Sequence, residues 1–149
     1  MKTRFIVVPL LLVFALGCGS NKLEKKVIST SDAPKAIGPY SQAIQVGNML
    51  YLAGQIAIDP ITGNMADEDV QAQTQQCMKN INAVLNAAGF SFTDVVQCQI
   101  FLTDLNNYST VNQIYAEYFK EAPPARAVVE VKRLPKDALI EIMIVAVKS

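Results

Sequence analysis

The pattern of apolar and polar positions first becomes regular in the segment GPYSQAIQVGNMLYLAGQIAI, at residues 38–58. Its first half alternates with a period of two from Tyr40 onward, which is typical of a strand. Its second half, residues 49–58, is almost continuously apolar. The Gly47–Asn48 pair between the halves is a frequent turn sequence, so the segment predicts a β-hairpin.

Two later stretches have the spacing of amphipathic helices. The first is expected from about Asp67 to Gly89, and the second after Ser109, which could cap it. The prolines of EAPPA, residues 121–125, end the second helix. The predicted apolar stripe of the first helix is Val70, Thr74, Cys77, Ile81, Val84, Leu85 and Ala88, and that of the second is Val111, Ile114, Tyr115, Tyr118 and Phe119.

Three further strands complete the pattern. The segment TDVVQCQIFLTD is expected to place four residues on one face: Val96, Cys98, Ile100 and Leu102. Strands at about 126–133 and 138–147 follow, joined by LPKD, and are expected to form a second hairpin. The order ββαβαββ predicts an α+β two-layer sandwich of one sheet and two helices.

The final strand, LIEIMIVAV, is apolar on both of its alternating sets. A strand with one face in water would alternate with polar residues, so this strand is predicted to be covered twice. Two helices suffice for one face of the sheet. The other face is expected to be buried against a second copy of the chain, which predicts a homo-oligomer.

The N-terminus has the layout of an export signal. Basic residues in MKTR precede an apolar run at residues 5–17, and the polar stretch CGSNKLEKK follows abruptly. ALGC resembles a bacterial lipobox, which implies cleavage before Cys18 and its lipidation. The expected organisation is a signal peptide (1–17), a lipidated cysteine and polar tether (18–30), and one domain (31–149). This predicts an exported, membrane-anchored lipoprotein on the periplasmic or cell-surface side; a plain signal peptide and an uncleaved anchor are the alternatives.

Composition narrows the chemistry. The 149 residues include no histidine, which excludes Ser-His-Asp and Cys-His catalysis and histidine-ligated metals. The formal net charge is +0, so nucleic acid is not the expected main partner. No metal-ligand spacing is present, and no cofactor is expected. Cys77 and Cys98 fall on apolar stripes and are interpreted as core residues.

Two charged residues stand out in the C-terminal strands. Glu141 is the only polar residue in LIEIMIVAV, and Arg126 heads the preceding strand. A buried carboxylate must be paired or protonated, because its desolvation costs several kcal/mol, on the order of a buried ion. One interpretation is a structural salt bridge across the hairpin. The other gives them separate tasks: Arg126 binds a substrate carboxylate, and Glu141 handles a proton or orients water.

Four separated motifs carry a resemblance to a known family: APKAIGPYSQAI, YLAGQIAIDPITGNM, FLTDLNNYSTVNQIYAEYF and PPARAVVEVKRLPKDALIEI. In this order they resemble the Rid family (RidA/YjgF-like proteins) over about residues 31–148. The resemblance implies a chorismate-mutase-like fold and a homotrimer with a central barrel and sites in the clefts between subunits. It also implies cofactor-free hydrolysis of reactive enamines and imines, such as 2-aminoacrylate, to 2-keto acids and ammonia.

The resemblance also implies roles for individual residues. Arg126 corresponds to the carboxylate-binding arginine, and Glu141 to the glutamate that positions water or a proton. Tyr40 in GPY, Gly54 in GQ and Asn112 in TVN correspond to residues that bind the substrate. The chain departs from the family pattern at Ala53, where many members have serine, and at Ala127 and Val128, where active deaminases commonly have a small or hydroxyl residue and then cysteine.

The resulting hypothesis is hydrolytic deamination of 2-enamino and 2-imino acids. The first alternative is a membrane-tethered trimer that binds small carboxylates without turnover, which Ala53 and Val128 favour. The others are a ribonuclease, which the neutral charge disfavours, and a tethered interaction protein with a vestigial site.

Overall fold

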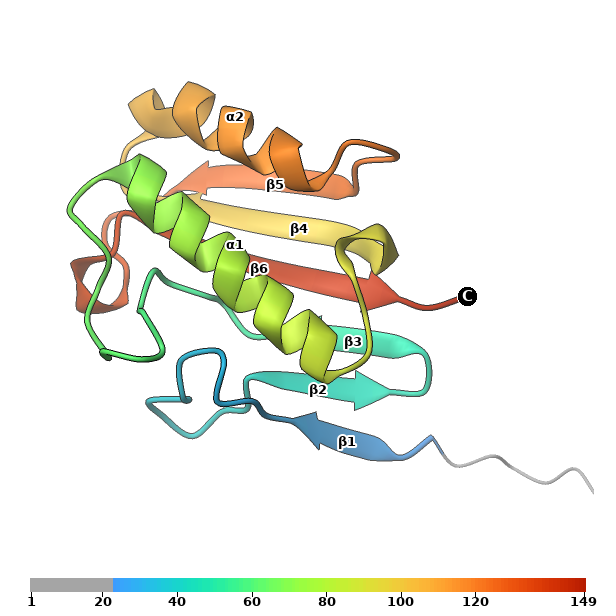
Figure 1. Cartoon of the computed structure of the whole chain (residues 1–149). Helices are drawn as coiled ribbons and strands as arrows, with labels where there is room; N and C mark the ends of the chain where they lie inside the picture. Colours follow the sequence, from blue (N-terminus) through green and yellow to red (C-terminus); the bar gives the residue numbers. More distant parts are fainter. Residues whose placement is uncertain (1–22) are drawn as a thin grey trace, which may run out of the picture.

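The structure, a computed structural model, describes residues 23–149, which form one mixed sheet with two helices on one of its faces (Figure 1). The six strands lie in the order β1-β2-β3-β6-β4-β5. Neighbouring strands are antiparallel except β4 and β5, which are parallel. The elements are β1 (Lys25–Ile28), β2 (Ala43–Val46), β3 (Met49–Leu52), α1 (Val70–Ala87), β4 (Val95–Leu102), α2 (Tyr108–Tyr118), β5 (Ala125–Glu130) and β6 (Ile140–Val147). The α+β prediction is confirmed.

One strand was not expected. The tether predicted for residues 18–30 is described only from residue 23, and Lys25–Ile28 within it form β1, which pairs antiparallel with β2. The segment is too polar to be recognised as a strand by its alternation. Its backbone pairs with the open edge of β2 instead, which no side-chain pattern reveals. The predicted signal peptide and Cys18 lie outside the described residues.

The α1 helix begins where its N-cap satisfies a free backbone donor. The Asp69 side chain accepts a hydrogen bond from the Ala72 amide at 3.1 Å. The helix was expected from about Asp67, two residues before this cap. Gly89 ends it with a φ of 76°, in the left-handed region that glycine adopts without strain. The predicted stripe faces the sheet and is buried, apart from half-buried Ala88.

The α2 helix also begins close to the predicted position. A short 3₁₀ turn at Leu105–Asn107 leads into it, and the Asp104 carboxylate accepts a hydrogen bond from the Asn106 amide at 2.8 Å. The helix itself starts at Tyr108, one residue before the predicted cap Ser109, and has no side-chain cap. Val111, Ile114 and Tyr115 are buried as expected.

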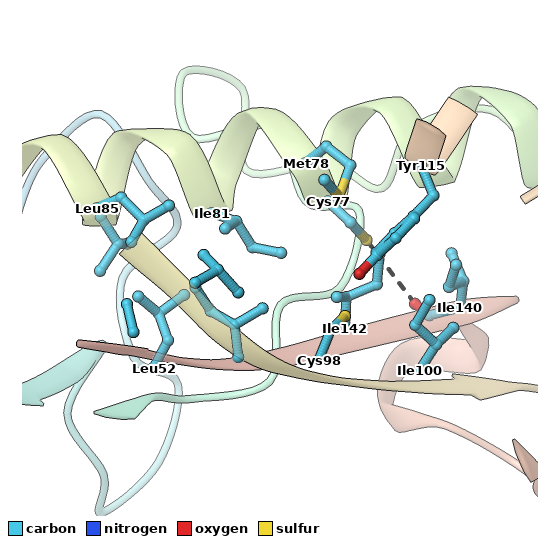
Figure 2. Close-up of a cluster of buried hydrophobic side chains, with 14 of the residues drawn as sticks. Leu52, Cys77, Met78, Ile81, Leu85, Cys98, Ile100, Tyr115, Ile140 and Ile142 are labelled. Atoms are coloured by element: carbon cyan, nitrogen blue, oxygen red, sulfur yellow. Dashed lines mark hydrogen bonds between the residues drawn. The ribbon is translucent and has the colours of Figure 1, made fainter. Parts of the chain in front are cut away.

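The core lies between the helices and the sheet. Figure 2 shows Met78, Ile81 and Leu85 of α1 above β-strand residues such as Ile142. Cys77 and Cys98 are both buried and free, which confirms their interpretation as core residues. Burial raises the pKa of both thiols above the usual range, to about 11 for Cys98.

The face of β4 differs from the prediction at its start. Val96 was expected to face the core with Cys98, Ile100 and Leu102, but Val96 is exposed and Val95 is buried instead. The pairing of β4 with β6 shifts register between Val95 and Gln97. This irregularity inserts one extra residue and inverts the alternation before it, and a period-two pattern cannot reveal such a shift.

The predicted C-terminal hairpin is wrong. β5 pairs with β4, whereas β6 lies between β3 and β4. The chain leaves β4, passes through α2, and returns as the parallel edge strand β5, as a crossover through a helix requires. The segment at residues 131–139 then carries it past β4 to the middle of the sheet (Figure 1). The central position suits β6, because Ile140, Ile142 and Ile144 are all buried against the helices.

Neither of the two described helices lies on the second face of the sheet (Figure 1). On β6 this face presents the alternate residues Glu141, Met143 and Val145, which are only half-buried. Exposed apolar side chains on it include Tyr51 and Val129. We call it the helix-free face. The described chain thus covers β6 on one face only, and the predicted second copy remains the expected cover for the other.

Candidate functional site

Glu141 stands on the helix-free face beside a cavity of about 310 Å³. The cavity is mainly apolar and is lined by Ile37, Tyr40, Ala53, Gly54, Ile56, Pro135 and Glu141. Desolvation by burial raises the pKa of the Glu141 carboxyl above its ordinary value. None of the described residues that line the cavity is an arginine or lysine that could offset this effect. The carboxyl group is therefore suited to hold a proton and to exchange it with a ligand.

Gly54 makes room for the Glu141 carboxyl. A Cβ atom built at Gly54 would overlap Oε1 of Glu141. The two residues meet because Gln55 forms an isolated bridge with Ile142: the Gln55 amide donates to the Ile142 carbonyl at 2.8 Å, and the Ile142 amide donates back at 3.0 Å. The absence of a side chain at Gly54 thus lets the carboxyl lie against the backbone of the segment after β3.

Tyr40 borders the same cavity from the loop that precedes β2. Its hydroxyl accepts a hydrogen bond from the Ile37 amide at 3.3 Å, and the residue is 49% exposed. The expected strand from Tyr40 begins only at Ala43. Tyr40 therefore points into a pocket from a bend and is not a paired strand residue.

Gln42 holds this loop in place, a role that sequence reasoning missed. Its buried amide accepts from the Thr30 amide at 2.7 Å and donates to the carbonyls of Thr30, Ala33 and Pro34 at 3.1, 3.2 and 2.8 Å. The only signal in the sequence is that a polar residue occupies position 42, which the alternation places among inward-facing residues. These bonds fix the segment that carries Tyr40 to the end of β1.

Arg126 lies at a different place, on β5 beneath α2. Its Cζ is 4.6 Å from the ring centre of Tyr115 and 5.7 Å from that of Tyr108. Its Nη2 donates a hydrogen bond to the Tyr108 hydroxyl at 3.3 Å. Across residues 23–149 the only ion pair within 4.0 Å is Arg133–Asp137, so the Arg126 guanidinium has no carboxylate partner there. Such a cation is available to an anionic ligand.

Asn112 accompanies Arg126 on α2. It follows Tyr108 by four residues and precedes Tyr115 by three, so the three side chains share one side of the helix. Its Oδ1 is buried and lacks a hydrogen-bond partner in the described chain, as does the Tyr115 hydroxyl. An unsatisfied buried acceptor is unusual in a folded protein and marks a place where a ligand can supply the missing donor.

The predicted site residues therefore form two groups. The first group surrounds the cavity and consists of Glu141, Tyr40 and Gly54. The second group lies at α2, where Arg126 and Asn112 are close to Tyr108 and Tyr115. The predicted contact between Arg126 and Glu141 does not exist within one chain.

The strand register explains the separation. Arg126 pairs with Cys98, a core residue on the helix side of β4, whereas Glu141 pairs with Phe101, on the opposite face. Their strands are also separated by β4, at two inter-strand spacings or about 10 Å, and their partners Cys98 and Phe101 are three residues apart along β4. The structural salt bridge between them is thereby excluded for a single chain.

Within the described range, no three cysteine, aspartate or glutamate side chains gather to hold a metal ion. Nor does any helix of residues 23–149 have the length and apolar character needed to cross a membrane.

Comparison with known proteins identifies the family. Residues 30–148 match the family described as Endoribonuclease L-PSP. The chain belongs to this family, also called the Rid family. The crystal structure of the Rid protein YyfA from Yersinia pestis is similar with a TM-score of 0.82 and 52% identity, covering 84% of this chain and 100% of that one.

Two other Rid relatives have informative names. The 2-iminobutanoate/2-iminopropanoate deaminase of Homo sapiens is 46% identical over 129 residues, which are 87% of this chain and 94% of the relative. The structure of Escherichia coli TdcF with bound serine has a TM-score of 0.80 and 42% identity and covers 83% of this chain and 99% of that one. The Rid resemblance read from the sequence motifs is confirmed.

Proposed function

We propose that this Rid protein is a cofactor-independent hydrolase that converts 2-enamino and 2-imino acids to 2-keto acids and ammonia. The proposal is carried by two separate groups: an Arg126 guanidinium that lies against the Tyr115 ring without a carboxylate partner in residues 23–149, and a half-buried Glu141 carboxyl whose pKa is raised. The human relative named for 2-imino acid deamination supports the substrate class, and the serine-bound relative supports a ligand that carries a carboxylate.

The proposed site is shared between subunits of a homotrimer with a central barrel. Arg126 and Glu141 are on opposite faces of the sheet, so one substrate can touch both only if they come from different chains. The apolar helix-free face, with Tyr51, Met143 and Val129, is a suitable surface for such an association. One subunit would contribute Glu141, Tyr40 and Gly54, and its neighbour Arg126 and Asn112.

The chemistry needs few groups, because an imine carbon is already electrophilic. Arg126 holds the substrate carboxylate with two parallel N–H donors. Water adds to the C=N carbon and gives a carbinolamine, which loses ammonia to leave the 2-keto acid. Glu141 takes a proton from the attacking water and returns it to the departing nitrogen. A raised pKa suits this exchange, since the carboxyl group must both accept and release a proton near neutral pH.

The test is a coupled assay with freshly generated 2-imino acids. Arg126→Ala and Glu141→Gln are expected to lower kcat/KM by about 100-fold or more, as typical for loss of an oriented ionic or proton-transfer group. Arg133→Ala is the matched control, because Arg133 is exposed and pairs only with Asp137. Full activity in a folded Arg126→Ala protein would refute the proposal.

The second candidate is a trimer that binds small carboxylates without turnover. Ala53, which lines the cavity without a hydroxyl, favours it. In that case 2-keto acids would bind in an Arg126-dependent manner while the imine assay stays at the uncatalysed rate.

We further propose that the protein is exported and anchored through a lipid on Cys18, on the basis of the sequence pattern at residues 1–18. Labelling with a radioactive fatty acid is expected for the wild type and not for Cys18→Ser. Equal labelling of the two proteins would refute the anchor.

A further inference from the structure

The side chains around Arg126 indicate how its guanidinium is oriented. An arginine side chain has several rotatable bonds, and a bidentate grip on a carboxylate requires one orientation of the planar guanidinium. Carboxylates usually set that orientation in proteins, but none lies within 4.0 Å of Arg126 among residues 23–149. The nearest carboxylate on its own strand, that of Glu130, instead accepts a hydrogen bond from the Leu105 amide at 2.9 Å.

Two tyrosines take the place of the missing carboxylate. Tyr108 and Tyr115 are seven residues apart, two turns of α2, so they lie on one side of the helix. Both ring centres are within about 6 Å of the Arg126 Cζ, the range in which a ring face attracts a cation. The Tyr115 ring is the nearer one and is almost completely buried, with its hydroxyl directed toward the sheet (Figure 2).

We propose that Tyr108 and Tyr115 are positioning residues that orient the Arg126 guanidinium for carboxylate binding, and that the Tyr108 hydroxyl completes the carboxylate site. This rests on the proposed function only in taking Arg126 as the group that binds the carboxylate. Tyr115 acts through its ring, which sets the plane of the guanidinium. Tyr108 acts through its hydroxyl, which accepts one hydrogen of Nη2.

The Tyr108 hydroxyl has a second capacity. A phenol both accepts and donates, and its own proton has no acceptor among the described residues. Tyr108 is 43% exposed, so this proton is accessible from solvent beside the guanidinium. A carboxylate held by Arg126 would receive it as an additional hydrogen bond. A carboxylate would then be preferred over anions that cannot reach both groups.

The Tyr115 hydroxyl provides an internal contrast. It is buried without a hydrogen-bond partner, so its removal takes away no bond to Arg126. Tyr115→Phe keeps the ring that stacks on the guanidinium, whereas Tyr115→Leu removes it. Tyr108→Phe keeps the ring and removes the hydroxyl. Tyr118→Phe, which changes an α2 tyrosine whose ring packs at a tilt against Phe92, is the matched control.

The experiment is isothermal titration calorimetry of the full chain with 2-oxobutanoate, which needs no turnover. Tyr108→Phe and Tyr115→Leu are each expected to weaken binding about 5–10-fold, the effect of one hydrogen bond or one cation–π contact. Tyr118→Phe is expected to stay within about twofold of the wild type, and Tyr115→Phe, which keeps the ring, to weaken binding less than Tyr115→Leu. If turnover is present, Tyr108→Phe raises KM more than it lowers kcat, because the lost contact is made in the bound substrate.

The outcomes separate this proposal from the proposed function. Wild-type affinity in both Tyr108→Phe and Tyr115→Leu overturns it, as does failure of the wild type to bind 2-oxobutanoate. If Tyr115→Leu does not fold, Arg126→Lys replaces it as the test of the ring's role. A lysine keeps the positive charge but lacks the planar guanidinium that the ring would orient, so wild-type affinity of Arg126→Lys would overturn the proposal. Arg126-dependent binding without imine hydrolysis would refute the deaminase and leave the positioning role intact.

Discussion

At the scale of single residues, the absence of a side chain at Gly54 is as important as the carboxyl group of Glu141. A Cβ at position 54 would overlap that carboxyl group. Gly54→Ala is expected to displace Glu141 and lower kcat/KM by about 10–100-fold, because small misplacements of a reacting group are costly. The fold should persist, since Gly54 has no left-handed φ.

Gly38→Ala is the control for this change. A Cβ at Gly38 would meet Tyr40 only at 3.5 Å, an ordinary contact distance. Kinetics of imino acid hydrolysis measure both variants, and equal activity of Gly54→Ala and the wild type would contradict the proposed clearance.

The raised pKa of Glu141 also predicts how stability varies with pH. Between the ordinary carboxyl pKa and the raised folded-state pKa, the folded state binds more protons than the unfolded state. The contribution of Glu141 to the free energy of unfolding therefore falls as pH rises through this window. Glu141→Gln, which mimics the protonated form, is expected to gain stability relative to the wild type as pH rises from 4 to 8.

Urea unfolding at several pH values measures this difference. Glu117→Gln, a substitution on the exposed side of α2, is the control. A stability difference between Glu141→Gln and the wild type that does not change with pH would contradict the raised pKa.

At the scale of elements, the loop before β2 depends on one buried amide. Gln42 makes four hydrogen bonds with Thr30, Ala33 and Pro34, and its removal leaves buried carbonyls without donors. Gln42→Ala is expected to lower the free energy of unfolding by about 2–4 kcal/mol. It should also raise KM, since the loop carries Tyr40.

Gln45→Ala on the same strand is the comparison, because the Gln45 amide bonds only to the Gly47 carbonyl at an exposed turn. Thermal unfolding and steady-state kinetics measure both changes. A Gln42→Ala protein as stable as Gln45→Ala would show that the loop is held by other contacts.

The elements also show where sequence patterns are reliable. The stripe of α1 predicted its buried residues, because α1 is a regular helix that packs directly on the core. The prediction that Val96 faces the core was wrong, because a register shift interrupts β4. β1 and the strand order depend on backbone pairing between distant segments, which leaves no local pattern.

At the scale of the whole molecule, the shared site predicts complementation between inactive variants. Arg126→Ala supplies an intact Glu141, and Glu141→Gln supplies an intact Arg126. When both are produced together in equal amounts, about one quarter of the sites at the subunit boundaries should carry both intact groups, if subunits mix at random in a closed ring. Recovery of about a quarter of wild-type activity is expected.

Each variant alone provides the baseline. Light scattering checks that the mixed protein has the mass of a trimer. Activity no higher than the baseline in a mixed trimer would place both groups in one chain, contrary to the proposal.

The sequence by itself determined the chemistry that this protein can use: a chain without histidine, with one carboxylate in an apolar strand and one arginine after a proline break, in motifs shared with the Rid family. It also determined the two helices and the core, because the side chains that become buried recur at the short, regular spacing of each element. Only the tertiary structure decided that Arg126 and Glu141 lie on opposite faces of the sheet. The physical reason is that β5 pairs with β4 through a helical crossover, and strand order follows from long-range backbone pairing rather than from side-chain periodicity.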